Sequence, residues 1–407
     1  MEEFRRQYST LYFLMCITGL WPFDKSILVK VQRTIIAIVI FCCIVIQFSS
    51  LIMTELTLTN ILMTLTLGCP LLLFFFRYVG FIYSFSVMGY VYENINNDCS
   101  TLKNPSELDI LSSHIDDSRR AVLIYLRKTI NNHINLGVSK SIVVTCCFAI
   151  FLIGVVLFCP WMLNFLIAKN QTQPHYLKAL GFFIEDRYVT PISVYIIVTF
   201  IIGLFTITVT EATLAVFAYY ACGLFKITSY RIQKMIDNAA REMSATKCNV
   251  SYHSSIREAV DIHGRVINII DSVANGVTLA YLIAIILVVV SFGLNMYRFF
   301  IAVVDVKDPL EIALGTMIVS VHLAIMFLNN HSGQKIRDDS LSVFDDTYDT
   351  VWYRTPVDMQ KMLLIIMVRS SIMCECNLSG LFVPCYEGFS MMMSTSFSYF
   401  TLLYSVQ

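Results

Sequence analysis

The C-terminal end of the chain carries a regular stripe of small hydroxyl side chains. Met391, Ser394, Ser398, Leu402 and Ser405 follow one another at intervals of three or four residues, which places them on one face of a helix. Hydroxyls that line a narrow path can pass hydrated ions, and a ring of leucines can close such a path by excluding water. Because one helix cannot enclose water, this interpretation needs several copies around an axis. The alternative is that the same small residues promote close packing between helices.

Three ionisable residues, Glu211, Glu387 and His322, fall within or at the ends of long apolar stretches. A charge is costly there unless it faces protein or water. We consider a gating contact for Glu211 and attraction of cations near the pore for Glu387. Each of the three could instead be a paired or hydrated structural residue. His322 has no titratable neighbour in the sequence, whereas an enzyme site needs a cluster of such groups.

The cysteines do not indicate a disulfide framework or a metal site. The chain has thirteen of them, an odd number, and most lie inside apolar runs. Cys374-x-Cys376 lacks a second pair of ligands at zinc spacing. We therefore expect no metal, no cofactor and no enzymatic activity.

The composition predicts a membrane protein. Of the 407 residues, 57% are apolar and 14% are charged, against roughly 45–50% and 25% in soluble domains. The 29 basic and 29 acidic residues give no net charge, so no overall field would attract nucleic acid. A lipid bilayer is the implied partner.

Seven stretches are long enough to cross a bilayer, for which about 20 mostly apolar residues are needed. The six clear ones are Thr34 to Met53, Asn60 to Phe81, Ser141 to Leu163, Pro191 to Leu214, Val273 to Leu294 and Ile312 to Asn329. The seventh, Leu378 to Leu403, contains Glu387 and many hydroxyl residues, which predicts a helix with one wet face. The expected fold is an all-α membrane protein with seven transmembrane helices.

The distribution of basic residues predicts the orientation of these helices. With a cytoplasmic N-terminus, 23 of the 29 Lys and Arg residues fall in inner segments and five in outer segments. The remaining one, Arg77, lies at the inner end of the second span, from which it could snorkel to the surface. Basic residues favour the cytoplasmic side. We therefore expect an inner N-terminus and an outer C-terminus, opposite to a G-protein-coupled receptor.

Several helices should continue beyond the bilayer on the inner side. Helical character runs on from Tyr219 to Met243 and resumes from Ser255. Thr355-Pro356 predicts a further helix start with Thr355 as its cap, and an apolar face follows at Met359, Met362, Leu363, Ile366 and Met367. That helix either packs in an anchor with the other extensions or lies on the membrane surface. The predicted regions are a cytoplasmic N-terminus (1–33), a six-helix ligand-binding region (34–329), anchor helices (330–377) and a final pore-lining helix (378–407).

The C-terminal third resembles the insect odorant receptor family, in particular the ligand-tuned receptors of ants and other Hymenoptera. The residues that carry the resemblance are Gly333, Ser340, Tyr348, Trp352, Tyr353, Lys361, Leu363, Leu364, Arg369, Ser370, Ser371, Phe389 and Ser398 to Leu403. A fainter match includes Glu211, Cys222-Gly223 and Lys226-Ile227. Gustatory receptors of the same superfamily usually end in a Thr-Tyr pair followed by a Gln-Phe pair. Here Ser398-Tyr399 is followed by Tyr404-Ser405, which favours an odorant receptor over a gustatory receptor channel.

The resemblance implies a tetrameric cation channel whose four final helices surround one pore. It also implies a co-receptor subunit as partner, in a hetero-tetramer in the plasma membrane of olfactory sensory neurons. The shared co-receptor has an enlarged second cytoplasmic loop that this chain lacks, so the chain resembles the tuning subunit. Carried over by position, the constriction falls on Leu402 and Val406, and this favours the pore interpretation of the hydroxyl stripe.

The resemblance also implies a pocket in the outer half of the subunit for a small, mostly apolar odorant. Apolar and aromatic side chains with few polar groups suit such a ligand. The candidates on the second, third and fourth spans are Cys69, Leu72, Leu73, Phe151, Gly154, Phe158, Trp161, Tyr195 and Thr199. Ordinary helix packing is the alternative for each of them.

Two other functions fit the sequence less well. A metabotropic seven-helix receptor would have the opposite charge bias and Asp-Arg-Tyr or Asn-Pro-x-x-Tyr motifs. A transporter would have paired broken helices in two related halves, whereas Pro70 and Pro384 interrupt spans without an internal repeat.

Overall fold

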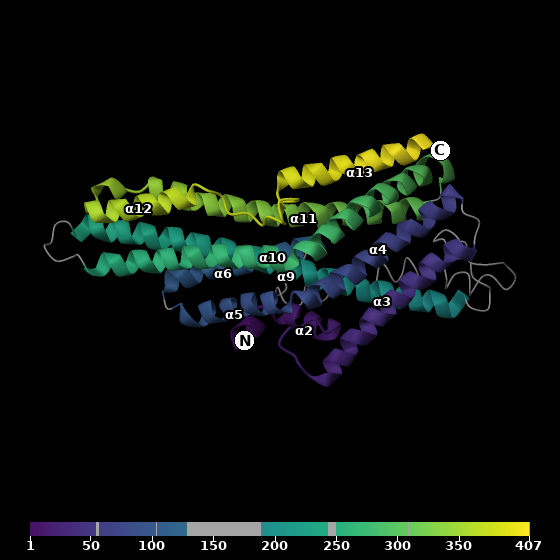
Figure 1. The fold of residues 1–407 in the computed structure, drawn as a ribbon, viewed down its shortest axis with the longest axis horizontal. Coiled ribbons are helices and arrows are strands. Elements are labelled where there is room, and N and C mark those ends of the chain that lie inside the picture. Colours follow the sequence, from purple (N-terminus) through teal and green to yellow (C-terminus); the bar gives the residue numbers. More distant parts are fainter. Residues whose placement is uncertain (54–56, 103, 128–188, 243–249, 308, 407) are drawn as a thin grey trace.

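The protein is an elongated bundle of helices (Figure 1). The computed structural model describes residues 1–53, 57–102, 104–127, 189–242, 250–307 and 309–406. Within these ranges the only β-type pairing is one isolated bridge, between Leu378 and Phe382. The chain is therefore an all-α protein, as predicted.

The described part of the chain contains the following helices in chain order. They are α1 (Glu2–Gln7), α2 (Ser9–Thr18), α3 (Ile27–Met53), α4 (Leu58–Tyr83), α5 (Phe85–Thr101), α6 (Pro105–Arg127), α9 (Val189–Glu242), α10 (Val250–Ile301), α11 (Pro309–Tyr348), α12 (Val357–Ser370) and α13 (Tyr386–Val406). A π-helical turn, Ala302–Val306, ends α10, and a 3-10 turn, Trp352–Arg354, precedes α12.

Three helices are much longer than a bilayer is thick. α9, α10 and α11 contain 54, 52 and 40 residues. At 1.5 Å per residue, α9 is about 80 Å long, against about 30 Å for the hydrocarbon core. The predicted extensions beyond the spans are therefore present. We call the end that contains α6 and α12 the anchor end, and the end that contains α3, α4 and α13 the bundle end (Figure 1).

Five described stretches are long and apolar enough to cross a membrane. They are Ile27–Ser49, Asn60–Tyr83, Val194–Ala239, Ser254–Val306 and Glu311–Tyr348. They coincide with the first, second, fourth, fifth and sixth expected spans. The third expected span, Ser141 to Leu163, lies outside the described residues.

The seventh expected span begins later than predicted. Its helix, α13, starts at Tyr386 rather than Leu378 and has 21 residues. Before it, the N–H of Leu378 donates to the carbonyl of Phe382 at 2.9 Å, which closes a tight turn. Ser379 and Gly380 have φ angles of 54° and 73°, a left-handed conformation that cannot continue a right-handed helix. Residues 378–385 are therefore a turn that delivers the chain to α13.

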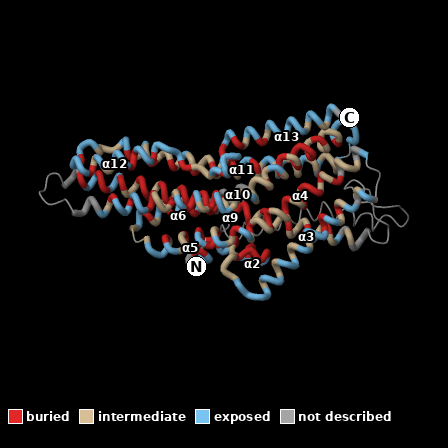
Figure 2. Tube along the Cα trace, viewed as in Figure 1, coloured by how far each residue is buried: buried red, intermediate tan, exposed pale blue. Residues whose placement is uncertain are grey.

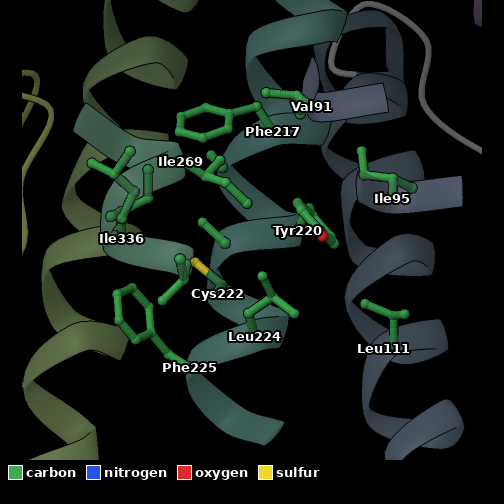
Figure 3. Packing of buried hydrophobic residues seen from close by; sticks show 14 of the residues in the cluster. Val91, Ile95, Leu111, Phe217, Tyr220, Cys222, Leu224, Phe225, Ile269 and Ile336 are labelled. Atoms are coloured by element: carbon green, nitrogen blue, oxygen red, sulfur yellow. The ribbon is translucent and has the colours of Figure 1, made fainter. Parts of the chain in front are cut away.

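The largest core lies at the anchor end and surrounds α9. Phe217, Tyr220, Cys222, Leu224 and Phe225 are buried although they point in different directions from α9. Figure 3 shows them between side chains of α5, α6, α10 and α11. A helix that is apolar all round is buried on every side. Figure 2 accordingly shows many buried residues along α9 and α10 at this end.

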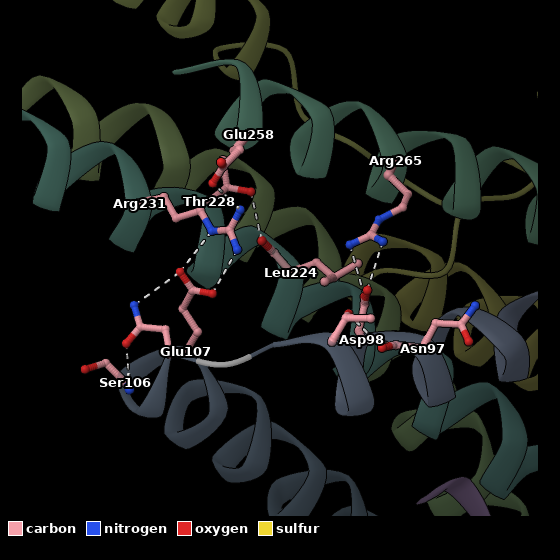
Figure 4. A network of polar contacts seen from close by, with 11 residues as sticks. Asn97, Asp98, Ser106, Glu107, Leu224, Thr228, Arg231, Glu258 and Arg265 are labelled. Atoms are coloured by element: carbon pink, nitrogen blue, oxygen red, sulfur yellow. Dashed lines mark hydrogen bonds and ion pairs between the residues drawn. The ribbon is translucent and has the colours of Figure 1, made fainter. Parts of the chain in front are cut away.

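Ion pairs fix α5 and α6 to the long helices (Figure 4). The Arg231 guanidinium donates to both carboxylate oxygens of Glu107, at 3.0 and 2.8 Å. Arg265 lies 2.8 Å from Asp98, and the Tyr220 hydroxyl donates to the same carboxylate at 2.6 Å. Bidentate, charge-assisted bonds of this kind set orientation as well as distance.

α12 packs at the anchor end with the face that the sequence predicted. Met359, Leu363, Ile366 and Met367 are buried in the large core, and Met362 packs against it. The predicted cap was wrong, because Pro356 takes the capping position and the Thr355 hydroxyl donates to the Trp352 carbonyl at 2.7 Å. The preceding 3-10 turn uses the Thr355 side chain instead.

Candidate functional site

One face of α13 attaches the helix to α10. Met392 and Ser396 are buried on this face, and the Ser396 hydroxyl donates to the carbonyls of Met392 at 2.8 Å and Val289 at 3.2 Å. Further along, the rings of Phe400 and Phe300 meet edge to face with centroids 5.8 Å apart. The inner face of α13 is thus specified by contacts within the chain.

The hydroxyl stripe lies on the opposite face of α13 and is exposed. Met391 and Leu402 are 52% and 58% exposed, and Ser394, Ser398 and Ser405 are exposed as well. The Ser398 and Ser405 hydroxyls donate to the carbonyls of Ser394 and Leu402 in the same helix, at 3.0 and 2.8 Å. These bonds use only the hydroxyl hydrogens, so both lone pairs of each oxygen remain able to accept. Val406 is the last residue of α13, and Leu403 is half-buried.

A buried ion pair joins α4 to α9. A nitrogen of Arg77 lies 2.6 Å from a Glu211 oxygen, and the two side chains are 9% and 2% exposed. The Arg77 guanidinium also lies over the ring of Tyr281 on α10, 5.0 Å from its centroid. Arg77 does not snorkel to the surface, so that expectation was wrong.

Two small pockets meet beside this ion pair and share Tyr281 and Asn329. The first reaches from Arg77 to Asn330, Phe382 and Met392, so it connects the ion pair with the turn before α13. The second runs toward the anchor end, between α9, α10 and α11, and is closed by Cys376, Leu378 and Pro384. Asn329 and Asn330, which are adjacent on α11, thus line the space between the ion pair and the turn before α13.

Comparison with known proteins assigns this architecture. The sequence profile of the family described as 7tm Odorant receptor matches residues 107–397, well over half of the chain. The chain belongs to the insect odorant receptor family. No curated protein sequence matches it significantly.

Solved structures show the same fold for this odorant receptor. The insect olfactory receptor OR5 from Machilis hrabei in complex with eugenol matches with a TM-score of 0.72 and 14% identity, over 100% of this chain and 99% of that chain. The structure of the same receptor described without a ligand gives 0.71 and 14%, over 99% and 98%. The predicted seven-helix membrane fold is therefore confirmed.

The described residues predicted to line the receptor's pocket lie on α4 and α9. Leu73 is buried in one apolar cluster, against which Leu72 and Tyr195 pack. Cys69 is 4% exposed. The Tyr195 hydroxyl donates to the Val39 carbonyl, and the Thr199 hydroxyl to the Tyr195 carbonyl. The other candidates, Phe151, Gly154, Phe158 and Trp161, lie outside the described residues.

The remaining ionisable residues of the receptor have partners on other helices. His322 contacts the Ser291 hydroxyl on α10 at 3.0 Å and the Ile318 carbonyl at 2.9 Å. Glu387, in the first turn of α13, lies 3.4 Å from Arg337 on α11 and is 74% exposed. The partners on other helices could not be found from the sequence, since they are 31 and 50 positions away and only the fold makes them neighbours. For Arg77 and Glu211 a signal was present, because two opposite charges occur inside apolar spans.

The described residues contain no group of three or more side chains that could hold a metal ion. Burial raises the pKa of the Cys376 thiol to about 12, so at neutral pH it is protonated and a poor metal ligand.

Proposed function

We propose that this odorant receptor is the ligand-tuned subunit of an odour-gated, non-selective cation channel. In this proposal it assembles with the co-receptor subunit as a hetero-tetramer in the plasma membrane of olfactory sensory neurons. Its ligands are small, mostly apolar volatiles or cuticular compounds. The observation that carries the proposal is the division of α13 into an inner face packed on α10 and an outward stripe of hydroxyls.

The stripe has the chemistry of a pore lining. Ser394, Ser398 and Ser405 are all exposed. The Ser398 and Ser405 hydroxyls donate their hydrogens within the helix, which leaves their oxygen lone pairs free to accept. Such oxygens can replace part of the water around a cation. Leu402, exposed on the same face, and Val406 would form the closed constriction, because apolar rings around a narrow axis exclude water.

The odour pocket is proposed between the second, third and fourth spans. Cys69, Leu72 and Leu73 on α4, with Tyr195 and Thr199 on α9, supply an apolar wall with two hydroxyls. Both hydroxyls donate to backbone carbonyls, so they offer a ligand only acceptor lone pairs. Phe151, Gly154, Phe158 and Trp161 are proposed to complete the pocket, and truncating one of the rings should reduce sensitivity roughly tenfold.

The distribution of charge supports an inner anchor end and an outer C-terminus. An epitope placed after Gln407 should be stained on intact cells. Staining only after permeabilisation would contradict this orientation.

Voltage clamp tests the channel function directly. The receptor is expressed with and without the co-receptor and challenged with eugenol, general volatiles and cuticular hydrocarbons. We expect odour-evoked cation current only from the pair. With Ser398→Cys, a charged thiol reagent added outside should block that current faster while the odour is present. Current that is insensitive to the reagent at both Ser398→Cys and Ser405→Cys would remove α13 from the pore.

A further inference from the structure

The first turn of α13 has backbone N–H groups for which the helix itself provides no acceptor. The first N–H groups of any helix lack an acceptor within it. In α13 the Gly388 N–H lies 3.4 Å from the Cys385 sulfur, a weak acceptor. The N–H groups of Cys385 and Tyr386 need acceptors from elsewhere.

A stripe on α11 supplies those acceptors. The Asn330 side-chain oxygen accepts from the Cys385 N–H at 3.1 Å, and the Gln334 side-chain oxygen accepts from the Tyr386 N–H at 3.3 Å. Because 330 and 334 are one turn apart, the two side chains lie on the same face of α11. Arg337, on the next turn, pairs with Glu387 at 3.4 Å. Three consecutive residues at the start of α13 are thus bound by successive turns of α11.

The Asn330 side chain is fixed in this role by its other contacts. It is 2% exposed. Its amide nitrogen donates to the Met326 carbonyl at 2.8 Å and lies 3.6 Å from the Met392 sulfur. The amide can therefore not turn without leaving a buried group unpaired, and its oxygen stays directed at Cys385.

The backbone of α11 and the turn before α13 approach so closely that position 333 requires glycine, and the start of α13 is equally crowded at Gly388. A Cβ added at Gly333 would lie 2.1 Å from the Pro384 carbonyl oxygen. One added at Gly388 would lie 2.6 Å from the Val383 oxygen and 3.0 Å from the Asn330 oxygen. A backbone carbonyl cannot give way as a flexible side chain can, so a larger residue at 333 would force α11 away from the turn before α13.

We propose that Asn330 and Gln334 are positioning residues that cap the pore helix from α11, so that a shift of α11 is passed directly to the first turn of α13. This inference rests on the proposed channel function. The neighbouring Asn329 lines the pockets beside the Arg77–Glu211 pair. One turn of α11 is therefore in contact with both the helices of the bundle and the base of the pore.

Hydrogen exchange of the purified receptor–co-receptor complex tests the cap without any need for activity. Asn330→Leu keeps the shape of the side chain but removes the acceptor, whereas Asn330→Asp keeps an acceptor. We expect exchange of the Cys385 and Tyr386 amides to rise roughly tenfold in Asn330→Leu and in Gln334→Met, and to stay near wild type in Asn330→Asp. The milder Gln334→Met decides the case if Asn330→Leu does not assemble.

The control is Asn94→Leu on α5. Asn94 also donates to the carbonyl four residues earlier, Tyr90, at 2.8 Å, but this hydrogen bond is exposed. It should leave exchange at the start of α13 unchanged. Equal exchange in wild type, Asn330→Leu and Gln334→Met would overturn the cap.

Voltage clamp then tests whether the cap transmits gating. Surface-labelled Asn330→Leu should give at least about fivefold less odour-evoked current than wild type, with Asn330→Asp restoring it to within about twofold. Raised exchange with normal evoked current would overturn the role in gating. A wild-type complex that is silent to every volatile would contradict the proposed channel function instead, and the exchange result would still decide the cap.

Discussion

The anchor end and α13 accommodate polar side chains in opposite ways. At the anchor end, carboxylates are buried and paired across helices, as in Arg231–Glu107 and Arg265–Asp98. α13 has no Asp, Glu, Lys or Arg after Glu387. Its exposed hydroxyls donate to carbonyls of their own helix, as Ser398 and Ser405 do.

This difference separates side chains that stabilise the single chain from side chains that face outward and contribute little to its stability. Breaking an anchor pair would leave a buried charge without a partner, which is strongly destabilising. An exposed serine whose hydrogen is already bonded within the helix can be replaced at little cost to the single chain. Substitutions should therefore have graded effects on stability, from the buried ion pairs to the outward face of α13.

The largest effect is expected at the ion pair between α4 and α9. Arg77→Met leaves the Glu211 carboxylate, which is 2% exposed, without its partner, at a cost of about 3–5 kcal/mol in unfolding free energy. We expect little folded protein at the cell surface and a lower thermal midpoint of the purified protein in detergent.

The double variant Arg77→Met with Glu211→Gln provides the comparison. It removes both charges, and it should recover much of the stability that Arg77→Met loses. The single variant Glu211→Gln is measured as well. If the double variant loses as much stability as Arg77→Met and Glu211→Gln added together, the two residues do not act as a pair.

A somewhat smaller effect is expected at the anchor end. Arg265→Leu leaves Asp98, with a 5% exposed side chain, bonded only to the Tyr220 hydroxyl among the contacts described above. Since Arg265 itself is 34% exposed, water can take over part of its role, and we expect a loss of about 2–3 kcal/mol. Thermal unfolding measures it.

The matched control is Lys361→Leu, in a pair with Asp358 whose side chains are 70% and 83% exposed. Such a surface pair is worth less than about 1 kcal/mol. Similar thermal midpoints for Lys361→Leu and Arg265→Leu would mean that buried and exposed ion pairs contribute equally to stability.

Much of the fold follows from local patterns in the sequence. Runs of apolar residues located the spans that the structure describes, because a bilayer requires length and hydropathy along one contiguous segment. The buried face of α12, with Met359, Leu363 and Ile366, was equally predictable, since helical spacing alone identifies it.

The candidate site was only partly predictable, because its key contacts join distant segments. The exposed hydroxyl stripe repeats along one helix and was visible in the sequence. The acceptors that Asn330 and Gln334 offer to α13 were not, because a single side chain 52 or 55 positions away carries no periodic signal. The start of α13 was misplaced for a different, local reason: hydropathy does not report the left-handed backbone conformation of Ser379 and Gly380, which keeps the segment before α13 from being helical.

The inner face of α13 should show an intermediate effect. Ser396 is fully buried and donates to Val289 on α10, so Ser396→Leu must both lose that bond and overfill the contact, at about 1–3 kcal/mol. Thr395→Leu, one position earlier and exposed, should change stability by less than about 0.5 kcal/mol. Equal thermal midpoints for the two variants would mean that α13 does not pack on α10 in this way.

The smallest effect on stability, with the largest on conduction, is expected at Leu402. This side chain is 58% exposed, so Leu402→Ser should shift the unfolding free energy of the receptor by less than about 0.5 kcal/mol.

If Leu402 forms an apolar ring, however, a hydroxyl there eases hydration of the closed pore and should raise the current without odour. Leu403 is the matched control, because it lies about 100° further round the helix and is half-buried. Leu403→Ser should lose some stability through its buried part and leave the resting current unchanged. The two variants thus predict opposite rankings in thermal unfolding and in voltage clamp. If they behave alike in both, the hydroxyl stripe is a packing surface and the difference between the anchor end and α13 has another origin.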